Sequence, residues 1–184
     1  PGFRLMSRAG RATWAAAAAR WPRARRVAVI CGGGNNGGDG YVVARLAQEA
    51  GLEVTLFHVG DPARLTGDAL TAAQAARKAG LEPRPYEGDD LGEFDLLVDA
   101  LLGTGLNGEV HGSARAAIEA MNKAGRPVVA VDIPSGLHAD TGAVLGTAVG
   151  ASVTVTFIGL KVGLFTGEGP DRAGEVVFHD LEVP

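Results

Sequence analysis

Short apolar, β-branched runs alternate with amphipathic helical segments along most of the 184-residue chain, and this alternation restricts the fold more than any other feature. It predicts an α/β domain with a parallel sheet covered on both faces. Strands are expected at 26–31, 53–58, 84–86, 94–99, 127–132, 152–157 and 175–178. Helices are expected at 3–20, 40–50, 68–79 and 112–124, with no clear helix between the last two strands. We therefore predict a three-layer, Rossmann-like sandwich around a mostly parallel sheet of about seven strands.

The composition excludes several classes of protein. Hydrophobic residues make up 46% of the chain and charged residues 21%, which predicts a folded globular domain. The formal net charge of −4 argues against a nucleic-acid partner, and no apolar run could span a membrane. The single cysteine, Cys31, is expected in the core, and its lack of a partner fits a reducing, cytoplasmic compartment. Because the chain begins at Pro1, we expect one domain, 1–184, that is truncated at its N-terminus.

Three polar or glycine-rich segments each follow a predicted strand. They are CGGGNNGGDG at 31–40, DALLGTG at 99–105 and DIPSG at 132–136. In a doubly wound sheet of order 3-2-1-4-5-6, the strands before them are neighbours, and the strand order reverses between strands 1 and 4. Ligands of such folds bind in the crevice at this reversal. We therefore expect the three segments to form one pocket.

The first of these segments has six glycines in ten residues, which indicates either positive φ angles or another molecule close to the backbone. Gly32-x-Gly34-x-x-Gly37 matches the dinucleotide fingerprint, but the second strand ends at His58 rather than at an acid. An ordinary dehydrogenase is therefore disfavoured, and a Walker A loop is excluded because no Gly-Lys-Ser/Thr follows. A helix N-terminus with free N–H groups suits a phosphate. Asp39 alone is expected to cap that helix, whereas the whole segment is expected to bind a ligand.

Two buried strands end in a carboxylate, at Asp99 and Asp132. Two carboxylates on neighbouring strand ends disfavour each other's charge, so either one is protonated or a cation lies near them. Asn36, Asp99 and Ser135 offer only oxygen ligands, which suits a hard cation rather than zinc. The histidines at 58, 111, 138 and 179 show no metal-ligand spacing and are expected on the surface or in loops. Lys161 is expected to be solvated.

Three sequence blocks stand out, namely GGGNNGGDGYVVARLA at 32–47, VDALLGTGLNGEV at 98–110 and VDIPSGL at 131–137. Together they resemble the YjeF N-terminal domain family, the NAD(P)H-hydrate epimerases. The resemblance implies a Rossmann-like fold and interconversion of the R and S forms of hydrated NADH and NADPH at C6. It also implies a partner, an ADP- or ATP-dependent dehydratase that consumes the S form and in many bacteria is fused after this domain. In the early element at 5–10, Ser7 stands where the family often has Glu.

The resemblance also implies the site residues. The substrate-binding residues would be Asn35, Asn36, Gly37, Gly38, Asp39, Gly103, Thr104, Gly105, Leu106, Asn107, Gly108, Glu109 and Asp132. The cofactor would be a potassium ion (K+), held by Asn36, Asp99 and Ser135, and Asp132 would be the catalytic acid and base. We expect a homodimer, in which the N-terminal helix either lies at the interface or covers the sheet.

Two other readings compete with the epimerase. One is a binding module that keeps the fold without the reaction; loss of Asp132 or Asn36 would favour it, and both residues are present. The other is a nucleotide-dependent kinase or dehydrogenase, which the missing Walker lysine and ribose-binding acid disfavour. No feature of the sequence separates the hydrate of NADH from that of NADPH as the preferred substrate.

Overall fold

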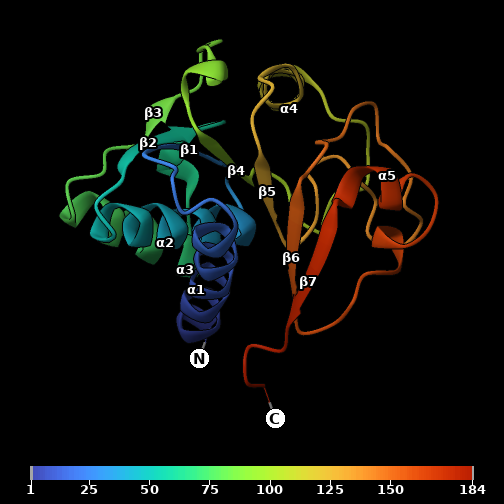
Figure 1. Ribbon diagram of the computed structural model, residues 1–184, viewed down its shortest axis with the longest axis horizontal. Coiled ribbons are helices and arrows are strands. Elements are labelled where there is room, and N and C mark those ends of the chain that lie inside the picture. The colour runs from blue at the N-terminus through green and yellow to red at the C-terminus, as the bar shows by residue number, and fades with distance from the viewer. Residues whose placement is uncertain (1, 184) are drawn as a thin grey trace.

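A single seven-stranded sheet forms the centre of the computed structural model, which describes residues 2–183 (Figure 1). The strands are β1 (Arg26–Cys31), β2 (Glu53–His58), β3 (Arg84–Pro85), β4 (Leu96–Ala100), β5 (Val128–Val131), β6 (Val153–Phe157) and β7 (Glu175–His179). They lie in the order β3-β2-β1-β4-β5-β6-β7, and every pairing is parallel. The predicted fold class is confirmed, and so is the reversal of strand order between β1 and β4.

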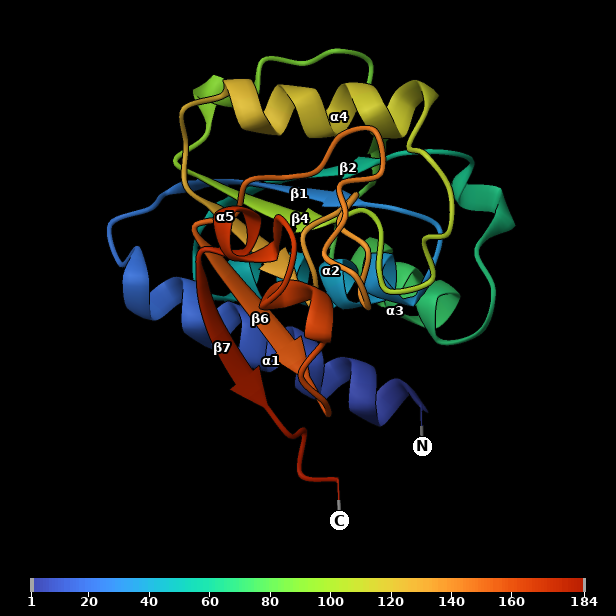
Figure 2. The same ribbon diagram turned by 90° about the vertical axis from the view of Figure 1, so that its right-hand side faces the viewer.

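Helices cover both faces of this sheet, with α4 on one side and α1, α2 and α3 on the other (Figure 2). The α-helices are α1 (Gly2–Arg20), α2 (Asn35–Glu49), α3 (Gly67–Lys78), α4 (Gly112–Lys123) and α5 (Gly169–Ala173). Three short 3-10 helices are η1 (Pro62–Arg64), η2 (Leu91–Glu93) and η3 (Val162–Leu164). The sequence predicted no helix between β6 and β7, whereas η3 and α5 lie there. Within residues 2–183, no helix combines the length and the apolar character needed to cross a membrane.

The two sides of the sheet are buried in separate hydrophobic clusters. Along β1, Val27 and Val29 pack in the cluster beneath α1, α2 and α3, while Ala28 and Ile30 pack in the cluster beneath α4. Successive side chains of a strand point to opposite faces, so a strand buried on both sides is expected to be mostly apolar. This explains why β1 could be recognised as a nearly unbroken apolar run.

The N-terminal helix α1 covers the sheet, which was one of the two alternatives for it. Met6, Ala9 and Ala17 are buried, and they belong to the same cluster as the apolar side chains of α2 and α3. Because α1 supplies part of the core, its apolar pattern needs no dimer to explain it. The homodimer stays a prediction.

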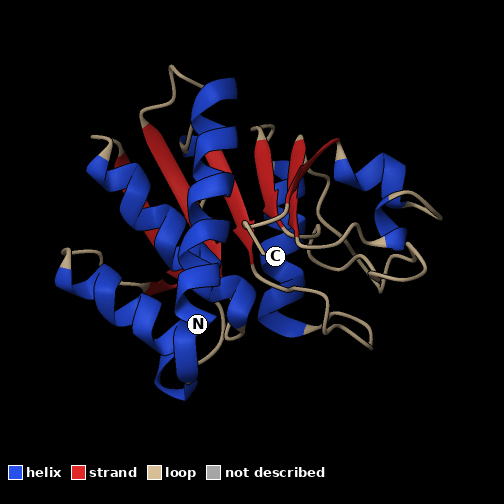
Figure 3. Ribbon diagram, turned by 90° about the horizontal axis from the view of Figure 1, so that it is seen from below, coloured by secondary structure: helices blue, strands red, loops and turns tan. Residues whose placement is uncertain are grey.

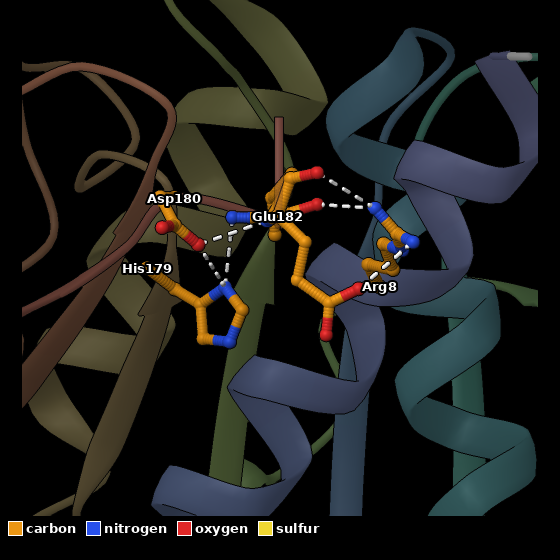
Figure 4. Close-up of polar contacts among 5 residues, drawn as sticks. Arg8, His179, Asp180 and Glu182 are labelled. Carbon is orange, nitrogen blue, oxygen red and sulfur yellow. Dashed lines mark hydrogen bonds and ion pairs between the residues drawn. The ribbon is translucent and has the colours of Figure 1, made fainter. Parts of the chain in front are cut away.

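The C-terminal segment returns to α1 and is fastened there by Arg8. The guanidinium of Arg8 donates a hydrogen bond to the carbonyl oxygen of Leu181 at 2.6 Å and forms an ion pair with Glu182 at 2.8 Å (Figure 4). The side chain of Leu181 is buried in the core cluster beneath α1. Both ends of the described chain therefore lie on one side of the domain, as seen from below in Figure 3.

Helix α2 begins earlier than the glycine-rich sequence predicts. It starts at Asn35 rather than at Gly40, and its N-cap residue, Gly34, provides no capping side chain. The prediction that Asp39 caps the helix is wrong, because Asp39 lies inside α2. Glycine is a poor helix former, which is why local pattern placed the start of the helix after the glycines. Tertiary packing at those glycines overrides this preference.

Candidate active site at the carboxyl edge of the sheet

A cavity of about 460 Å³ opens where β1, β4 and β5 end. Its walls are Gly33, Gly34, Asn35, Asn36, Asp39, Leu101, Leu102, Gly103, Thr104, Gly105, Leu106 and Asp132. These residues come from all three segments that were expected to meet, so the prediction of a single pocket at the reversal of strand order is confirmed. The volume lies in the range typical of small-molecule sites.

The structure brings some of the predicted site residues to this cavity and leaves others outside it. Eight predicted residues line it, namely Asn35, Asn36, Asp39, Gly103, Thr104, Gly105, Leu106 and Asp132. Seven do not, namely the substrate-binding candidates Gly37, Gly38, Asn107, Gly108 and Glu109 and the metal-ligand candidates Asp99 and Ser135. The site prediction did not include Gly33, Gly34, Leu101 and Leu102. Gly34 and Leu102 directly precede the predicted residues Asn35 and Gly103, and Gly33 and Leu101 lie one residue further away.

The glycines of the first segment serve two different purposes, and none of them has a positive φ angle. A Cβ atom on Gly32 would lie 1.9 Å from the carbonyl oxygen of Leu101, and one on Gly37 would lie 2.0 Å from that of Gly32. Gly38 and Gly40 face side chains at similarly close distances. Gly33 and Gly34, in contrast, face open space on the cavity wall. Packing thus explains four of the glycines, and room for a ligand explains only two.

Asp99 and Ser135 form a buried polar pair beneath the cavity. The hydroxyl of Ser135 donates to Oδ1 of Asp99 at 2.6 Å, and the backbone N–H of Ser135 donates to Oδ2 at 2.8 Å. Both residues are fully buried. Burial raises the pKa of Asp99 to about 6, although the hydrogen bonds from Ser135 oppose the shift. The pair shows how the end of β4 is tied to the segment that follows β5.

Asn36 completes this cluster with an unsatisfied oxygen. Its side-chain amide donates to the carbonyl oxygen of Leu102 at 3.0 Å, and the N–H of Leu102 donates to the hydroxyl of Ser135 at 2.8 Å. Oδ1 of Asn36 is buried and accepts no hydrogen bond from any residue between 2 and 183. A buried acceptor without a partner is costly unless a ligand or ion satisfies it. The donor set of amide, carboxylate and hydroxyl oxygens suits a hard cation such as K+.

Asp132 follows β5 in a strained turn. Its φ angle is 67°, and the N–H of Ile133 bonds back to the carbonyl oxygen of Val131 at 2.8 Å, which closes a three-residue turn. Such turns with positive φ are rare for residues other than glycine and store strain. The turn places the Asp132 carboxylate on the wall of the cavity.

Lys161 pairs with Asp132, and the prediction of a solvated lysine is therefore wrong. The ammonium nitrogen of Lys161 lies 2.5 Å from Oδ1 of Asp132, and the two side chains are only 18% and 19% exposed. The charge that accompanies Asp132 is thus the ammonium of Lys161. Burial, rather than the charge of Asp132, raises the pKa of Asp99. Asp132 is therefore paired with an ammonium group, whereas Asp99 accepts hydrogen bonds from Ser135.

Asp39 is the carboxyl group whose pKa is raised by burial and by the charge of Asp132. Burial in α2, together with the negative charge of Asp132, holds the pKa of Asp39 well above its usual range. Asp39 and Asp132 line the same cavity. Groups with such contrasting surroundings in one pocket are suited to acid and base roles.

A second cavity, of about 620 Å³, adjoins the first. The two share four residues, Asn35, Asp39, Thr104 and Asp132. Much of the second cavity is apolar, and Ile158, Leu160 and Val162 on its wall are more than half exposed. Large apolar side chains exposed around a polar centre indicate a surface that meets a ligand. The run IGLKVGLF after β6 carries this signal in the sequence, although only its lysine was named as a candidate for a ligand contact.

His58 is buried, which corrects its expected place on the surface or in a loop. It ends β2 with 2% of its surface exposed, and its Nδ1 lies 2.7 Å from the hydroxyl of Tyr41. Burial lowers the pKa of His58. Cys31 is buried as predicted, and burial raises the pKa of its thiol, so it is an inert core residue.

Fold and site together define a Rossmann-like domain with a ligand pocket at the reversal of strand order. Residues 2–163 match the family described as "YjeF-related protein N-terminus". The chain belongs to this family, as the sequence blocks predicted.

Named relatives agree with this assignment, and a solved structure shares the fold. The chain is 48% identical over 179 residues to the "Bifunctional NAD(P)H-hydrate repair enzyme Nnr" of Coxiella burnetii, covering 97% of this chain and 37% of that enzyme. It is 40% identical over 182 residues to the "NAD(P)H-hydrate epimerase" of Limosilactobacillus fermentum, covering 98% of this chain and 86% of the relative. The crystal structure of yeast YNL200c superposes with a TM-score of 0.80 at 22% identity, covering 97% of this chain and 78% of the yeast chain. The chain spans 37% and 35% of the length of two bifunctional relatives.

Proposed function

We propose that this protein epimerises hydrated NADH and NADPH at C6 of the nicotinamide ring, interconverting the R and S forms. The observation that carries the proposal is the Asp132 carboxylate, set by a strained turn into a cavity that the helix α2 N-terminus also faces. Free N–H groups at a helix N-terminus suit the diphosphate of a dinucleotide. Relatives named NAD(P)H-hydrate epimerase and NAD(P)H-hydrate repair enzyme support the same activity.

The chemistry requires a proton donor and a proton acceptor near C6. When the hydroxyl on C6 takes up a proton, it leaves as water, because the lone pair of the ring nitrogen stabilises the cation that forms. Water then adds back to C6 from either face and gives up a proton. In the proposed reaction Asp39, whose raised pKa favours the neutral acid, can donate the proton, and the Asp132 carboxylate can accept the proton that the returning water gives up. Before the next turnover Asp132 gives its proton to water and Asp39 takes one up from water, which restores both groups. The direction of water return decides whether the R or the S form results.

A potassium ion would sit on Asn36, Asp99 and Ser135. The unsatisfied Oδ1 of Asn36 and the buried carboxylate of Asp99 fit a cation with oxygen ligands. The bound ion would supply positive charge that stabilises the buried carboxylate and the three segments around it. These side chains hold the ends of β4 and β5 to the start of α2, so their role in the proposal is to keep the cavity assembled.

Replacing K+ by tetramethylammonium at equal ionic strength is expected to lower the melting temperature. Loss of a ligand present at 100 times its Kd costs about 2.7 kcal/mol, and each kcal/mol shifts the melting temperature of a domain of this size by about 2–4 °C. Differential scanning calorimetry in the two chloride salts measures the effect. Asp99→Asn is the control that should remove the difference between the salts. Equal melting temperatures of the wild-type protein in both salts would argue against the ion site.

The activity is tested by following pure (R)-NADHX, the hydrate of NADH, by chromatography, with and without the protein. The protein is expected to speed the appearance of the S form well beyond the slow spontaneous rate measured in the same buffer. A folded protein that leaves the spontaneous rate unchanged would favour the binding module without the reaction. We expect the S form to be consumed by a dehydratase, and the bifunctional relatives are consistent with a second activity on one chain.

A further inference from the structure

Lys161 is anchored at two points beside the site. Its ammonium group donates to Oδ1 of Asp132 at 2.5 Å and to the carbonyl oxygen of Phe157 at 2.8 Å. Phe157 is the last residue of β6, so the lysine is fastened to the sheet as well as to the carboxylate. A partly buried ammonium with two hydrogen bonds differs from the mobile lysine of a protein surface.

The hydrogen bonds of Asp132 are distributed unequally between its two carboxylate oxygens. Oδ1 accepts from the hydroxyl of Thr156 at 3.1 Å, the N–H of Phe157 at 3.2 Å and the ammonium of Lys161 at 2.5 Å. No hydrogen bond from residues 2–183 reaches Oδ2. One oxygen is therefore held by the protein, and the other is left for a molecule in the cavities that Asp132 lines.

We propose that Lys161 is a positioning residue that fixes the Asp132 carboxylate through Oδ1 so that Oδ2 is presented to the substrate. The inference rests on the proposed epimerase function, because it concerns how Asp132 meets the reacting ring. Lys161 itself needs no contact with the substrate to act in this way.

The ammonium is the dominant of the three donors. Its bond to Oδ1 is the shortest, and it joins a cation to an anion, whereas Thr156 and Phe157 offer neutral donors. Asp132 sits at a φ angle of 67°, which the surrounding contacts must maintain. Without Lys161, two neutral bonds at 3.1 and 3.2 Å would have to hold a carboxylate that shares its cavity with Asp39.

The same arrangement explains the unusual backbone that leads to Lys161. Ile158 has a φ angle of 65°, and the N–H of Gly159 bonds to the carbonyl oxygen of Phe157 at 2.7 Å, so β6 ends in the same kind of three-residue turn as β5. A positive φ at a β-branched residue is costly. The turn brings the chain back at once, so that Lys161 reaches the carbonyl oxygen of Phe157 and the neighbouring carboxylate.

Lys161→Met tests the proposal, with Lys78→Met and Lys123→Met as matched controls on exposed ends of α3 and α4. Misplacing a catalytic group costs up to about 100-fold in rate, so kcat for (R)-NADHX is expected to fall about 10- to 100-fold in Lys161→Met. KM should stay nearly constant, and both control variants should keep the wild-type values. In Lys161→Ala, added ethylammonium should restore part of kcat in a saturable way, and tetramethylammonium, which has no N–H group, should not.

Several outcomes would overturn the proposal. They are an unchanged kcat in Lys161→Met, a rise in KM with kcat preserved, or equal rescue by the two cations. A wild-type protein without activity would instead overturn the proposed function. In that case the positioning role of Lys161 is tested without activity, by carbon-13 NMR of protein labelled at aspartate Cγ. The Asp132 signal is assigned as the one that Asp132→Asn removes. Lys161→Met should move that signal and Lys123→Met should not; an unmoved signal refutes the positioning role.

Discussion

Replacing Asp132 by Asn should lower kcat for epimerisation of (R)-NADHX by about 100- to 10,000-fold, the range that general acid–base groups contribute. Asparagine keeps the shape of the side chain and an oxygen that can accept the hydrogen bonds of Thr156 and Phe157. It cannot take up or give back a proton at the atom that faces the cavity. The fold should persist, because Asp132 lies at the surface of the cavity rather than in the core.

The measurement is the rate at which the R and S forms approach equilibrium, corrected for the spontaneous reaction. Asp171→Asn is the matched control, since Asp171 is an exposed carboxylate on α5 that lines neither cavity. Circular dichroism of both variants establishes that each is folded. Full turnover in Asp132→Asn would remove Asp132 from the acid–base role and leave Asp39 as the carboxyl group in the cavity to be tested next.

Replacing Gly37 by Ala should destabilise the protein by about 3 kcal/mol or more, as expected for a severe overlap in a packed interior. The added Cβ would lie 2.0 Å from the carbonyl oxygen of Gly32, which is a backbone atom and cannot swing aside. Alanine normally favours a helix over glycine by about 1 kcal/mol. The clash reverses this preference, because α2 would have to move away from the segment after β1 to relieve it.

Gly33→Ala provides the comparison for Gly37→Ala. Gly33 belongs to the same segment, but a Cβ there meets nothing within 4 Å, so its effect on stability should stay within about 0.5 kcal/mol. Urea unfolding of the two variants, followed by circular dichroism, measures both values. Similar midpoints for the two variants would mean that Gly37 does not hold α2 against the strand.

Most of the fold could be predicted from the sequence because it depends on local patterns. β1 and β2 were predicted residue for residue, since each is a short run rich in Val and other strand-forming residues between breaks. The start of α2 was misplaced because no capping side chain marks it and glycines fill its first turns. The helix between β6 and β7 was missed because α5 has five residues, too few to show a helical period.

The candidate site was predictable only in outline. Strand ends of a parallel sheet meet at one edge, so Asp99, Asp132 and the glycine-rich segment could be placed together from topology alone. The pairing of Lys161 with Asp132 could not, because it depends on a strained turn after β6 that no sequence pattern announces. The hydrogen bond between the buried side chains of His58 and Tyr41 likewise joins two elements and has no signal in the sequence.

The sequence therefore determines which elements form, how the strands are arranged and which edge of the sheet carries the candidate site. These features follow from hydrophobic periodicity and from the connection rules of parallel sheets. The tertiary structure decides which glycines serve packing and which leave room for a ligand, since that depends on distances such as the 2.0 Å between a Cβ on Gly37 and the oxygen of Gly32. It also decides which charges compensate one another. A carboxylate finds its partner through space, and Lys161 reaches Asp132 from the segment that follows the neighbouring strand β6, 29 residues along the chain.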